Sequence, residues 1–529
     1  MKLPLTPLRF KSRAVEQFGS KQGVVCKDLR LTYSQFGRRC DQLAAALLAL
    51  GLQPLERVAV LSYNCHRLLE AYYGVLEARG ILLPLNIRLS ERELKFILRD
   101  SGAAFLLYHS DFSALVHTLT PDLPALEHAI VLDGGETPQV GSLPHYEELL
   151  AAHDPVSKDY LDVDEDAVAE LFYTSGTTAD PKGVMLTHRN LYLHALEVIA
   201  ALAYGPDAVV LHTIPLFHVN GWGTPQTLTC QGGTHVLLEK FNPLDVLRLI
   251  EAERVQYFSA VPTMVQALIS HPDIGGFDLR SLKTVNIGGA ACAPSLLRNA
   301  EEKLGCQIVG GYGLSETSPV LTVSLLKPHL QVSEEERVQL QSMAGYAIAG
   351  AEIRVVDDAG RDVARDGATV GEIAVRGDMV MEGYWRQPEA TAAAIRDGWF
   401  YTGDMGTWNE DRYIVIVDRK KDIIVTGGEN VSSLDVERIL MAHPAVFECA
   451  VIPIPDERWG EMVMAVVVAR PGASLDAAEL ELHCRKSLAG FKVPRRFEFR
   501  SELPKGGTGK ILKREIREPY WAGHQRRVN

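Results

Sequence analysis

Residues 173–184 read YTSGTTADPKGV and combine four serine and threonine hydroxyls, two glycines and one lysine. The preceding residues, AVAELFY, are typical of a strand, and loops that follow strands in α/β proteins often bind ligands. Glycines let successive backbone N–H groups turn toward one anion, while the hydroxyls and Lys182 add donors and positive charge. Such a segment suits a polyphosphate, although an isolated cluster of this kind is more often a polar surface turn.

The segment is not a Walker A loop. That motif, GxxxxGK[ST], requires a glycine directly before the lysine, whereas Pro181 precedes Lys182 here. GGTGK at 506–510 fails as well, because Pro504 takes the place of the first glycine and Ile511 follows the lysine. A phosphate site in this chain must therefore be built from a different kind of loop.

Three further segments have comparable chemistry. GGYGLSETSP at 310–319 is a second glycine-rich stretch with an acidic residue in it, and YTGD at 401–404 ends in another acid. LPKGGTGKILKRE at 503–515 places a lysine beside glycines, ahead of a basic helix. Each of these alone has an ordinary explanation, such as a turn, a core residue or a solvated charge run, and it is the ordered set that indicates a nucleotide site.

The composition indicates a globular enzyme with more than one domain. The chain has 529 residues, too many for one ordinary core, with 47% hydrophobic and 23% charged residues. A formal net charge of −13 argues against a nonspecific nucleic-acid binder, so an anionic ligand must be held locally. The eight cysteines contain no CxxC pair, and we expect them to be reduced and mostly buried.

Short apolar runs alternate with helical patterns along most of the chain. RVAVLSYN, GILLPLN, AAFLLYH, HAIVLD, VQYFSAV and KTVNIGG are typical of strands. Between them, CDQLAAALLALG, HRLLEAYYGVLEARG and PSLLRNAEEKLG are typical of helices. The alternation predicts an α/β fold of layered subdomains with largely parallel sheets.

The pattern changes near residue 418, where YIVIVDRKKDIIVTGGENVSS has a charged break between two apolar runs. After it, the helix-like VSSLDVERILMAHP and LDAAELELHCRKSLAG alternate with the strand-like FECAVIPI, EMVMAVVVAR and RRFEFRSEL. We therefore predict a large N-terminal domain over 1–417 and a small α+β C-terminal domain over 418–529, a normal size for an independent unit.

The sequence gives no indication of a membrane protein. The first residues, MKLPLTPLRFKSRAVEQFGS, lack the continuous apolar core of a signal peptide, and no run of about 18 apolar residues occurs. We therefore expect a cytoplasmic protein with no membrane anchor and no nucleic-acid partner.

Taken in order, the four motifs closely resemble those of the adenylate-forming superfamily of acyl-CoA synthetases, nonribosomal-peptide adenylation domains and luciferases. The resemblance extends from LTYSQFGRRCDQLAAALLALGL to GKILKRE, nearly the whole chain. It implies that a carboxylic acid and ATP form an acyl-adenylate and pyrophosphate, and that the acyl group then passes to a thiol with release of AMP. ATP and CoA would be co-substrates, and Mg²⁺ would be the cofactor.

The resemblance also assigns roles in the first step. Glu316 would bind Mg²⁺ together with the Thr174 hydroxyl, a set of hard oxygen ligands that suits this ion. Lys510 would lie across the reacting oxygens, where a cation offsets the negative charge of the transition state. The residues that would hold the β- and γ-phosphates of ATP are Thr174, Ser175, Gly176, Thr177, Thr178 and Lys182.

Other motifs would bind the nucleoside. By the same resemblance, Tyr312 would stack on the adenine, and Asp404 would accept hydrogen bonds from the ribose hydroxyls, with Arg419 reinforcing that contact. Ser315 stands where many relatives have threonine, and its hydroxyl keeps an α-phosphate contact available. The glycines of this nucleotide site would be Gly289, Gly310, Gly311 and Gly313.

In the second step, the small domain of relatives rotates about a hinge residue, and the matching position here is Asp418. Gly427 and Gly428 would then leave room for the pantetheine arm of CoA. The same loop also resembles the start of a helix, because Ser432 with Asp435 fits a capping box, and both interpretations can hold.

IPLFHVNGW at 214–222 matches the stretch that lines the acyl pocket of relatives. His218 stands where amino-acid-activating members have an aspartate for the substrate amine, so an α-amino acid is disfavoured, and His218 joins Lys510 and Glu316 as a candidate catalytic residue. The chain looks most like bacterial medium- and long-chain fatty acyl-CoA synthetases, in which a tryptophan gates the acyl tunnel. The acyl pocket would be lined by His218, Val219 and Trp222.

Three functions stay open on the sequence. The first is an ATP-dependent fatty acyl-CoA ligase. The second is an adenylating ligase for an aryl acid or a short thioether acid, or one that transfers the acyl group to a carrier protein. The third is a noncatalytic nucleotide- or acyl-binding relative. Relatives with this acyl-segment pattern are often homodimers, so the resemblance also raises a homodimer, although no stretch identifies an interface.

Overall fold

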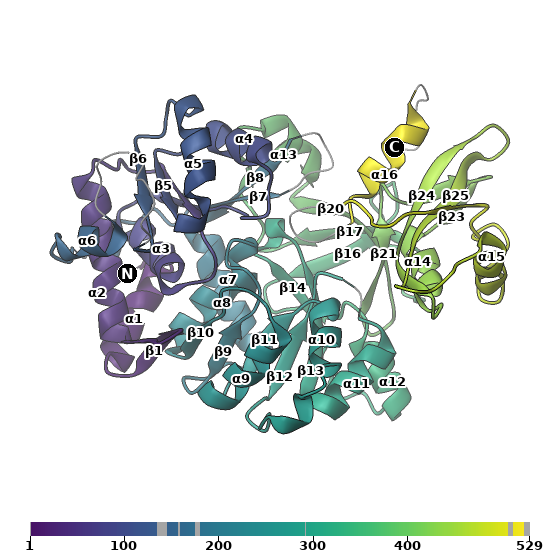
Figure 1. The fold of residues 1–529 in the computed structure, drawn as a ribbon, viewed down its shortest axis with the longest axis horizontal. Helices are drawn as coiled ribbons and strands as arrows, with labels where there is room; N and C mark the ends of the chain where they lie inside the picture. The colour runs from purple at the N-terminus through teal and green to yellow at the C-terminus, as the bar shows by residue number, and fades with distance from the viewer. Residues whose placement is uncertain are drawn as a thin grey trace. The chain divides into compact units, whose positions relative to one another are not determined.

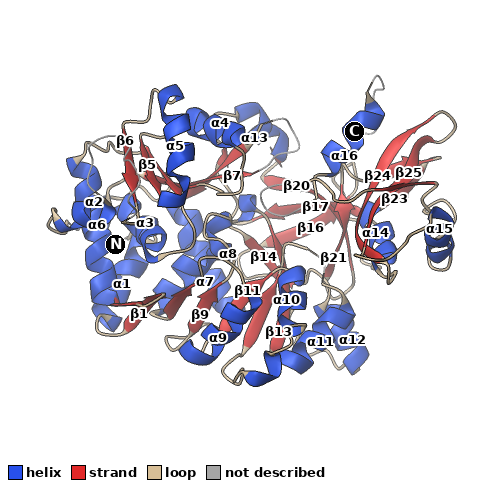
Figure 2. Cartoon of the chain, viewed as in Figure 1, coloured by secondary structure: helices blue, strands red, loops and turns tan. Residues whose placement is uncertain are grey.

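The computed structural model describes residues 2–134, 145–156, 159–174, 180–290, 292–505 and 511–522, with the side chains of Val219, Asn220 and Trp222 outside that description. The chain forms two compact units. Unit 1 contains residues 1–353 and 375–400, and unit 2 contains residues 354–374 and 401–529. Helices and strands alternate through unit 1, which confirms the predicted α/β fold class (Figures 1 and 2).

A seven-stranded sheet of unit 1 contains the strand before the first glycine- and hydroxyl-rich segment and the strand after it. Its order is β18-β8-β7-β4-β3-β5-β6. The strands are β3 (Arg57–Leu61), β4 (Ile81–Pro84), β5 (Phe105–Tyr108), β6 (His128–Val131), β7 (Val168–Thr174), β8 (Lys182–Thr187) and β18 (Gly383–Tyr384). From β7 to β6 the pairing is parallel, whereas β8 and β18 are antiparallel additions at the edge. The four apolar runs predicted as the first strands are thereby confirmed as β3 to β6.

A second sheet of unit 1 has nine strands in the order β15-β14-β13-β12-β11-β9-β10-β1-β2. They are β1 (Gln22–Cys26), β2 (Leu29–Thr32), β9 (Val209–His212), β10 (Thr234–Leu237), β11 (Tyr257–Ala260), β12 (Thr284–Ile287), β13 (Gln307–Gly313), β14 (Val320–Val323) and β15 (Tyr346–Ala347). From β10 to β13 the pairing is parallel, and VQYFSAV and KTVNIGG are confirmed as β11 and β12. The carboxyl end of β13, where open α/β sheets commonly bind ligands, carries the second glycine-rich segment.

The helices of unit 1 cover these sheets (Figure 2). They are α1 (Leu8–Phe18), α2 (Tyr33–Ala49), α3 (His66–Glu77), α4 (Glu91–Ser101), α5 (Ser113–Leu119), α6 (Tyr146–Ala151), α7 (His188–Leu202), α8 (Val219–Gln231), α9 (Pro243–Glu253), α10 (Pro262–Ile269), α11 (Pro294–Leu304), α12 (Glu334–Gln341) and α13 (Pro388–Ala394). The three predicted helices are confirmed within α2, α3 and α11. Among the described residues, no helix is long and apolar enough to cross a membrane.

Unit 2 has its own sheets and its own core. One sheet contains β16 (Glu352–Val356), β17 (Gly371–Arg376), β20 (Trp399–Trp408) and β21 (Ile414–Arg419). The short β19 (Ile395–Arg396) pairs with residues 399–400 at the start of β20, and all four of these residues are in unit 1. The other contains β22 (Ile424–Thr426), β23 (Glu429–Val431), β24 (Val446–Asp456), β25 (Gly460–Ala469) and β26 (Arg496–Phe499). The helices are α14 (Ser433–Met441), α15 (Ala477–Arg485) and α16 (Lys513–Trp521). The helices and strands predicted after residue 431 are confirmed as α14, β24, β25, α15 and β26.

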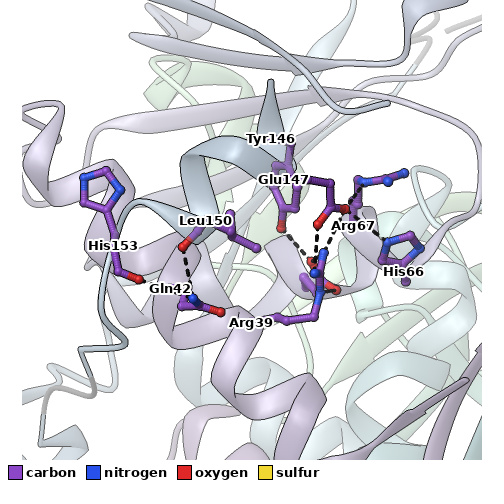
Figure 3. A network of polar contacts seen from close by, with 9 residues as sticks. Arg39, Gln42, His66, Arg67, Tyr146, Glu147, Leu150 and His153 are labelled. Carbon is purple, nitrogen blue, oxygen red and sulfur yellow. Dashed lines mark hydrogen bonds and ion pairs between the residues drawn. The ribbon is translucent and has the colours of Figure 1, made fainter. Parts of the chain in front are cut away.

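An ion-pair network fixes α2, α3 and α6 to one another (Figure 3). Arg39 of α2 lies between two carboxylates, with its Nε 2.6 Å from Oε1 of Glu70 and its Nη1 2.9 Å from Oε2 of Glu147. Tyr146 donates to Oε2 of Glu70 at 2.7 Å, and Arg67 Nε lies 2.7 Å from Oε1 of Glu147. Because the Glu70 side chain is fully buried, the Arg39 guanidinium supplies the opposite charge that its burial requires.

The cysteines are free thiols, as predicted, and six of the eight are buried. Burial raises the pKa of the Cys292 thiol to about 11, and that of Cys306 to about 12, with the charge of Glu301 adding to the latter. Both thiols therefore keep their protons near neutral pH, as expected of structural rather than reactive cysteines.

Candidate active site

The first glycine- and hydroxyl-rich segment connects two paired strands. β7 ends at Thr174, β8 begins at Lys182, and these two residues are opposite each other in the antiparallel ladder. Strand pairing therefore fixes both ends of the predicted phosphate-binding segment, the threonine at one end and the lysine at the other. The predicted residues between them, Ser175, Gly176, Thr177 and Thr178, lie outside the described residues.

Several of the predicted nucleotide-site glycines have structural reasons to be glycine. A Cβ atom on Gly313 would lie 1.6 Å from the backbone oxygen of Pro319, and one on Gly310 or Gly311 would lie 3.1 Å from a backbone oxygen. Gly289, just after β12, has a φ of 77°, a conformation that favours glycine. The backbone at the end of β13 is therefore too closely packed for a side chain at residue 313.

The acidic residue of the second glycine-rich segment lies in a short 3-10 helix, η5 (Ser315–Thr317), just after β13. The backbone oxygen of Glu316 accepts a hydrogen bond from the N–H of Met381 at 2.9 Å. Ser315 is buried, and the N–H of Tyr312 donates to a side chain of β14. The turn that carries Glu316 is therefore held both by its own sheet and by the chain near residue 381.

Tyr384, which was not singled out in the sequence, contacts both Glu316 and Lys182. Its hydroxyl donates to Oε1 of Glu316 at 3.0 Å, and Lys182 Nζ lies 4.9 Å from the centroid of its ring. Burial, and then the charge of Glu316, raise the pKa of Tyr384 well above its usual value, so the phenol stays protonated and acts as a donor. The only signal in the sequence is GYW at 383–385, a pattern that aromatic core residues also produce.

The predicted acyl segment, 214–222, begins as a loop that ends at His218, the N-cap of α8, and continues into the first residues of that helix. Asn64, a buried residue between β3 and α3, forms hydrogen bonds with this loop. Its Nδ2 donates to the backbone oxygens of His212 and Ile214, each at 3.0 Å, and its Oδ1 accepts from the N–H of Leu216 at 2.7 Å. These three bonds define the path of the backbone that leads to His218.

A neutral histidine packs against α8 near its N-terminal end. His194 of α7 is buried, and a Cβ atom on Gly223 would lie 2.7 Å from its Cε1. Burial lowers the pKa of His194 to about 3, and its Nε2 accepts from the N–H of Val320 at 3.0 Å. This neighbour of the acyl segment is therefore uncharged. The side chains of Val219 and Trp222, predicted to line the acyl pocket, lie outside the description.

In unit 2, Asp404 and Arg419 are opposite each other on β20 and β21. Arg419 Nε lies 3.3 Å from Oδ1 of Asp404, and the Asp404 side chain is buried while that of Arg419 is half exposed. The two residues predicted to bind the ribose are therefore brought together by strand pairing.

Asp418, the predicted hinge residue, binds the start of α14. Its Oδ2 accepts from the N–H and the hydroxyl of Ser433, at 2.5 and 2.7 Å, and its Oδ1 accepts from the N–H of Arg419 at 2.7 Å. Ser432 accepts from the N–H of Asp435 at 3.1 Å, which confirms the predicted helix start. A carboxylate at this position also interacts favourably with the helix dipole.

Gly427 and Gly428 form the two-residue turn between β22 and β23, with φ angles of 60° and 89°. Tight hairpin turns with positive φ at both central residues favour glycine. A Cβ atom on Gly427 would lie 2.6 Å from Cε3 of Trp459, whereas one on Gly428 would meet no described atom within 4 Å. Turn geometry therefore accounts for both glycines, whatever ligand approaches them.

Lys510 lies outside the described residues, but the chain on either side of it is fixed. Lys505 and Ile511 form an isolated antiparallel bridge. Lys513, the first residue of α16, places its Nζ 2.8 Å from Oε1 of Glu437. The segment that contains Lys510 thus has both of its ends tied to unit 2.

Comparison with known proteins identifies the family. Residues 11–385 match the family model described as AMP-binding enzyme, and residues 435–510 match the AMP-binding enzyme C-terminal domain. The chain belongs to the AMP-binding enzymes. The family predicted from the four ordered motifs is thereby confirmed.

Similar proteins place this AMP-binding enzyme in the acyl-CoA synthetase branch. A long-chain-fatty-acid–CoA ligase of Thermus thermophilus is 38% identical over 521 residues, which cover 97% of this chain and 95% of that protein. A feruloyl-CoA synthase of an Amycolatopsis species is 40% identical over 491 residues, covering 93% and 94%. The crystal structure of the anthranilate CoA ligase AuaEII in complex with anthranoyl-AMP has a TM-score of 0.86 at 26% identity, covering 98% of both chains. The protein is therefore an AMP-forming acid–CoA ligase, which uses ATP to activate a carboxylic acid.

The two predicted metal ligands of this AMP-binding enzyme have the chemistry that a Mg²⁺ ion held together with a nucleotide requires. Within the described ranges, no group of three His, Cys, Asp or Glu side chains is placed to hold a metal. Glu316 and the Thr174 hydroxyl offer hard oxygens, and Mg²⁺ is commonly bound by one or two carboxylates plus substrate phosphates. A bound ion would offset the negative charge of those phosphates.

Proposed function

We propose that this AMP-binding enzyme converts a medium- or long-chain fatty acid to its CoA thioester. The observation that carries the substrate class is the chemistry of the acyl segment. IPLFHVNGW contains no carboxylate that could bind a substrate amine, and the buried His194 beside it is neutral. Leu216 and Phe217 of the same segment are buried. The similarity to a long-chain-fatty-acid–CoA ligase supports the same substrate class.

In the first step, charge neutralisation and positioning at the phosphates would dominate the barrier. Lys182 and the segment that ends at it would bind the β- and γ-phosphates. Thr174 and Glu316 would hold Mg²⁺, and Lys510 would lie across the reacting oxygens. The nucleoside would be bound by Tyr312, Asp404 and Arg419, with Ser315, Gly289, Gly310, Gly311 and Gly313 around it.

In the second step, the C-terminal domain, proposed to be residues 418–529, would rotate about Asp418. The bonds from Asp418 to the N-terminus of α14 support this proposal, because dihedral changes just before Asp418 would carry α14 along as a unit. The turn at Gly427 and Gly428 would then face the pantetheine arm of CoA, and the thiol would attack the acyl-adenylate.

An aryl acid is the second candidate substrate. The feruloyl-CoA synthase is as similar to this chain as the fatty-acid ligase is, and the anthranilate CoA ligase shares the fold over 98% of both chains. Either substrate would be activated by the same adenylation residues, so the acyl pocket around His218 would decide between a fatty acid and an aryl acid.

A pyrophosphate-release assay tests the proposal. Saturated acids from acetate to palmitate, together with benzoate and cinnamate, are assayed with and without CoA, and the acyl-CoA product is confirmed by mass. Each buried methylene contributes about 0.8 kcal/mol, close to fourfold in affinity, so we expect a steep rise in kcat/KM with chain length followed by a cutoff. A flat profile, or activity only with aryl or very short acids, would reject the fatty-acid proposal and leave the adenylation chemistry in place.

We also propose that the enzyme is cytoplasmic and that it forms a homodimer. Relatives with this acyl-segment pattern are often homodimers. Light scattering after size-exclusion chromatography should then give about twice the chain mass of 58.2 kDa. The mass of a single chain would reject the homodimer.

A further inference from the structure

Tyr384 joins the two charged residues to which the proposed function assigns the phosphates and the metal. Its hydroxyl donates to Oε1 of Glu316 at 3.0 Å, and its ring centroid lies 4.9 Å from Nζ of Lys182. One side chain therefore contacts a carboxylate through its polar end and an ammonium group through its aromatic face.

The backbone around Tyr384 is fixed to the elements that carry both partners. Tyr384 pairs with Val184 in the β18–β8 ladder, two residues beyond Lys182 on the same strand. The N–H of Trp385 donates to the oxygen of Gly183 at 2.7 Å. On the other side, the N–H of Met381 donates to the backbone oxygen of Glu316 at 2.9 Å. The segment 381–385 is thus bonded both to β8 and to the turn that carries Glu316, and the Tyr384 side chain has little freedom to move away from either.

The position just before the tyrosine leaves no room for a side chain. A Cβ atom on Gly383 would lie 2.7 Å from Cγ2 of Thr391, and the Thr391 hydroxyl accepts from the N–H of Tyr384 at 2.9 Å. The middle of α13 therefore packs against β18 and holds Tyr384 in register with Lys182 and Glu316.

We propose that Tyr384 is a positioning residue for adenylation, which orients the Glu316 carboxylate toward Mg²⁺ through its hydroxyl and holds Lys182 at the phosphates through its ring. The inference rests on the proposed roles of Glu316 and Lys182. Residues that hydrogen-bond a metal ligand without touching the metal fix the orientation of that ligand, and their loss typically lowers metal affinity or activity by about 10- to 100-fold.

Two substitutions separate the two contacts. Tyr384→Phe removes only the hydroxyl and keeps the ring, so Glu316 loses the hydrogen bond from Tyr384 while Lys182 keeps its contact. Tyr384→Leu removes both. Tyr33→Phe is the matched control, because Tyr33 is also buried in unit 1 and its hydroxyl donates to the backbone oxygen of Gly233 at 2.6 Å.

Calorimetric titration with ATP, once with Mg²⁺ and once with EDTA, gives the readout without any acid substrate. We expect Tyr384→Phe to weaken ATP binding about tenfold or more in Mg²⁺ and to leave it unchanged in EDTA, as a loss confined to the metal requires. Tyr384→Leu should weaken binding in EDTA as well. Tyr33→Phe should match the wild type in both.

Three results would overturn the inference. Wild-type affinity of Tyr384→Phe in Mg²⁺ would show that the hydroxyl does not act on the metal site. Equal weakening in Mg²⁺ and EDTA would indicate a structural role alone. ATP binding by the wild type that does not respond to Mg²⁺ would remove the metal role of Glu316 and the inference with it. A wrong acid substrate leaves all of these outcomes unaffected, because no acid is present, so failure of the fatty-acid proposal is distinguishable.

Discussion

Asp404 and Arg419 are direct partners across the β20–β21 ladder, with Arg419 Nε 3.3 Å from Oδ1 of Asp404. The Asp404 side chain is buried and that of Arg419 is half exposed, so substitution of Asp404 and substitution of Arg419 should affect ATP binding to different extents. Loss of Arg419 leaves the Asp404 carboxylate in place, because β20 still orients it. Loss of the Asp404 charge leaves only a neutral, weaker acceptor for the ribose hydroxyls.

We expect Asp404→Asn to raise the KM for ATP about tenfold or more, because a hydrogen bond to a charged group contributes about 1.5–3 kcal/mol. Arg419→Met should raise it less than about fivefold, since the Arg419 guanidinium is half exposed and a solvent-screened ion pair contributes at most about 1 kcal/mol. Pyrophosphate release at varied ATP concentration measures both. Arg412→Met, in the exposed turn between the same strands, is the control. Equal losses in the two variants would contradict the assigned roles.

Glu197 of α7 gives the stability of the protein a pH dependence. Burial, and then the charge of Asp378, raise the pKa of Glu197 to about 7. Its Oε2 is buried without a hydrogen-bond partner in the described part of the chain. The folded protein therefore binds this proton more tightly than the unfolded chain does. Proton binding to Glu197 therefore stabilises the folded protein. This stabilisation is fully present below the ordinary glutamate pKa of 4.5 and is lost as the pH rises through about 7.

Glu197→Gln should therefore stabilise the protein by about 1–2 kcal/mol near pH 8, a value reduced for solvent screening of this partly exposed group. Near pH 5 the change should be small, because Glu197 is already protonated there. Thermal unfolding at the two pH values measures the difference, and the exposed Glu302→Gln is the control. A gain of the same size at both pH values would show that packing, rather than the proton, is responsible.

The Arg39 network predicts a large loss of stability from one substitution. Arg39→Met should destabilise unit 1 by about 3–5 kcal/mol, because the fully buried Glu70 carboxylate loses its counter-charge. Arg39→Lys should recover only part of this, since an ammonium group cannot reproduce the paired contacts to Glu70 and Glu147. Thermal unfolding is the measurement, and Arg38→Met, an exposed neighbour on the same helix, should unfold like the wild type. A wild-type melting temperature for Arg39→Met would contradict the prediction.

The strands and helices could be predicted because their signals are local. The central strands β3, β4 and β5 pair in parallel and are covered on both faces, so they read as continuous apolar runs in the sequence. Ser432 likewise announces the start of α14 within four residues. Gly427 and Gly428 were also recognised, but as a site of ligand approach, whereas turn geometry alone already favours glycine at both.

The role of Tyr384 could not be predicted, because it depends on pairings between distant parts of the chain. Its partner Glu316 is 68 residues away, and Lys182 lies on β8, which pairs with the β18 strand of Tyr384 although the two strands are far apart in the sequence. The raised pKa of Glu197 depends in the same way on burial and on Asp378, which approach it only in the folded chain. Local patterns report how a segment folds, and they contain no record of which side chains it meets.

The ion pair between Lys513 and Glu437 should stabilise unit 2. Its Nζ lies 2.8 Å from Oε1 of Glu437, and both side chains are largely buried. Lys513→Met should destabilise unit 2 by about 3–5 kcal/mol, because it leaves the Glu437 charge buried and unpaired. Lys505→Met is the matched control, since Lys505, which pairs with Glu448, is 42% exposed, and solvent screening lowers the contribution of such a pair to about 0–1 kcal/mol.

A second substitution, Glu437→Gln, removes the buried charge that Lys513→Met leaves unpaired. Glu437 also accepts from the N–H of Val451 at 2.7 Å, so Glu437→Gln keeps an acceptor there while removing the carboxylate. The double variant with Lys513→Met should be more stable than Lys513→Met alone. No recovery in the double variant would show that lost packing, rather than an unpaired charge, causes the effect.

The hairpin turn at Gly427 and Gly428 allows turn strain to be separated from CoA binding. Alanine at a positive φ costs about 1–2 kcal/mol, so Gly428→Ala, which meets no described atom within 4 Å, should cost about that much. Gly427→Ala should cost more, because its Cβ would lie 2.6 Å from Cε3 of Trp459. Trp459→Leu should reduce the excess in a double variant. Equal losses for the two alanine variants would contradict this contact.

The same pair of variants tests the proposed approach of the pantetheine arm. If the arm passes the turn, the added methyl of Gly428→Ala should raise the KM for CoA severalfold while adenylate formation, measured as pyrophosphate release without CoA, keeps its wild-type rate. A change confined to the CoA step requires a contact made only in that step, because general destabilisation of unit 2 would lower both rates. An unchanged KM for CoA in Gly428→Ala would mean that these glycines serve the turn alone.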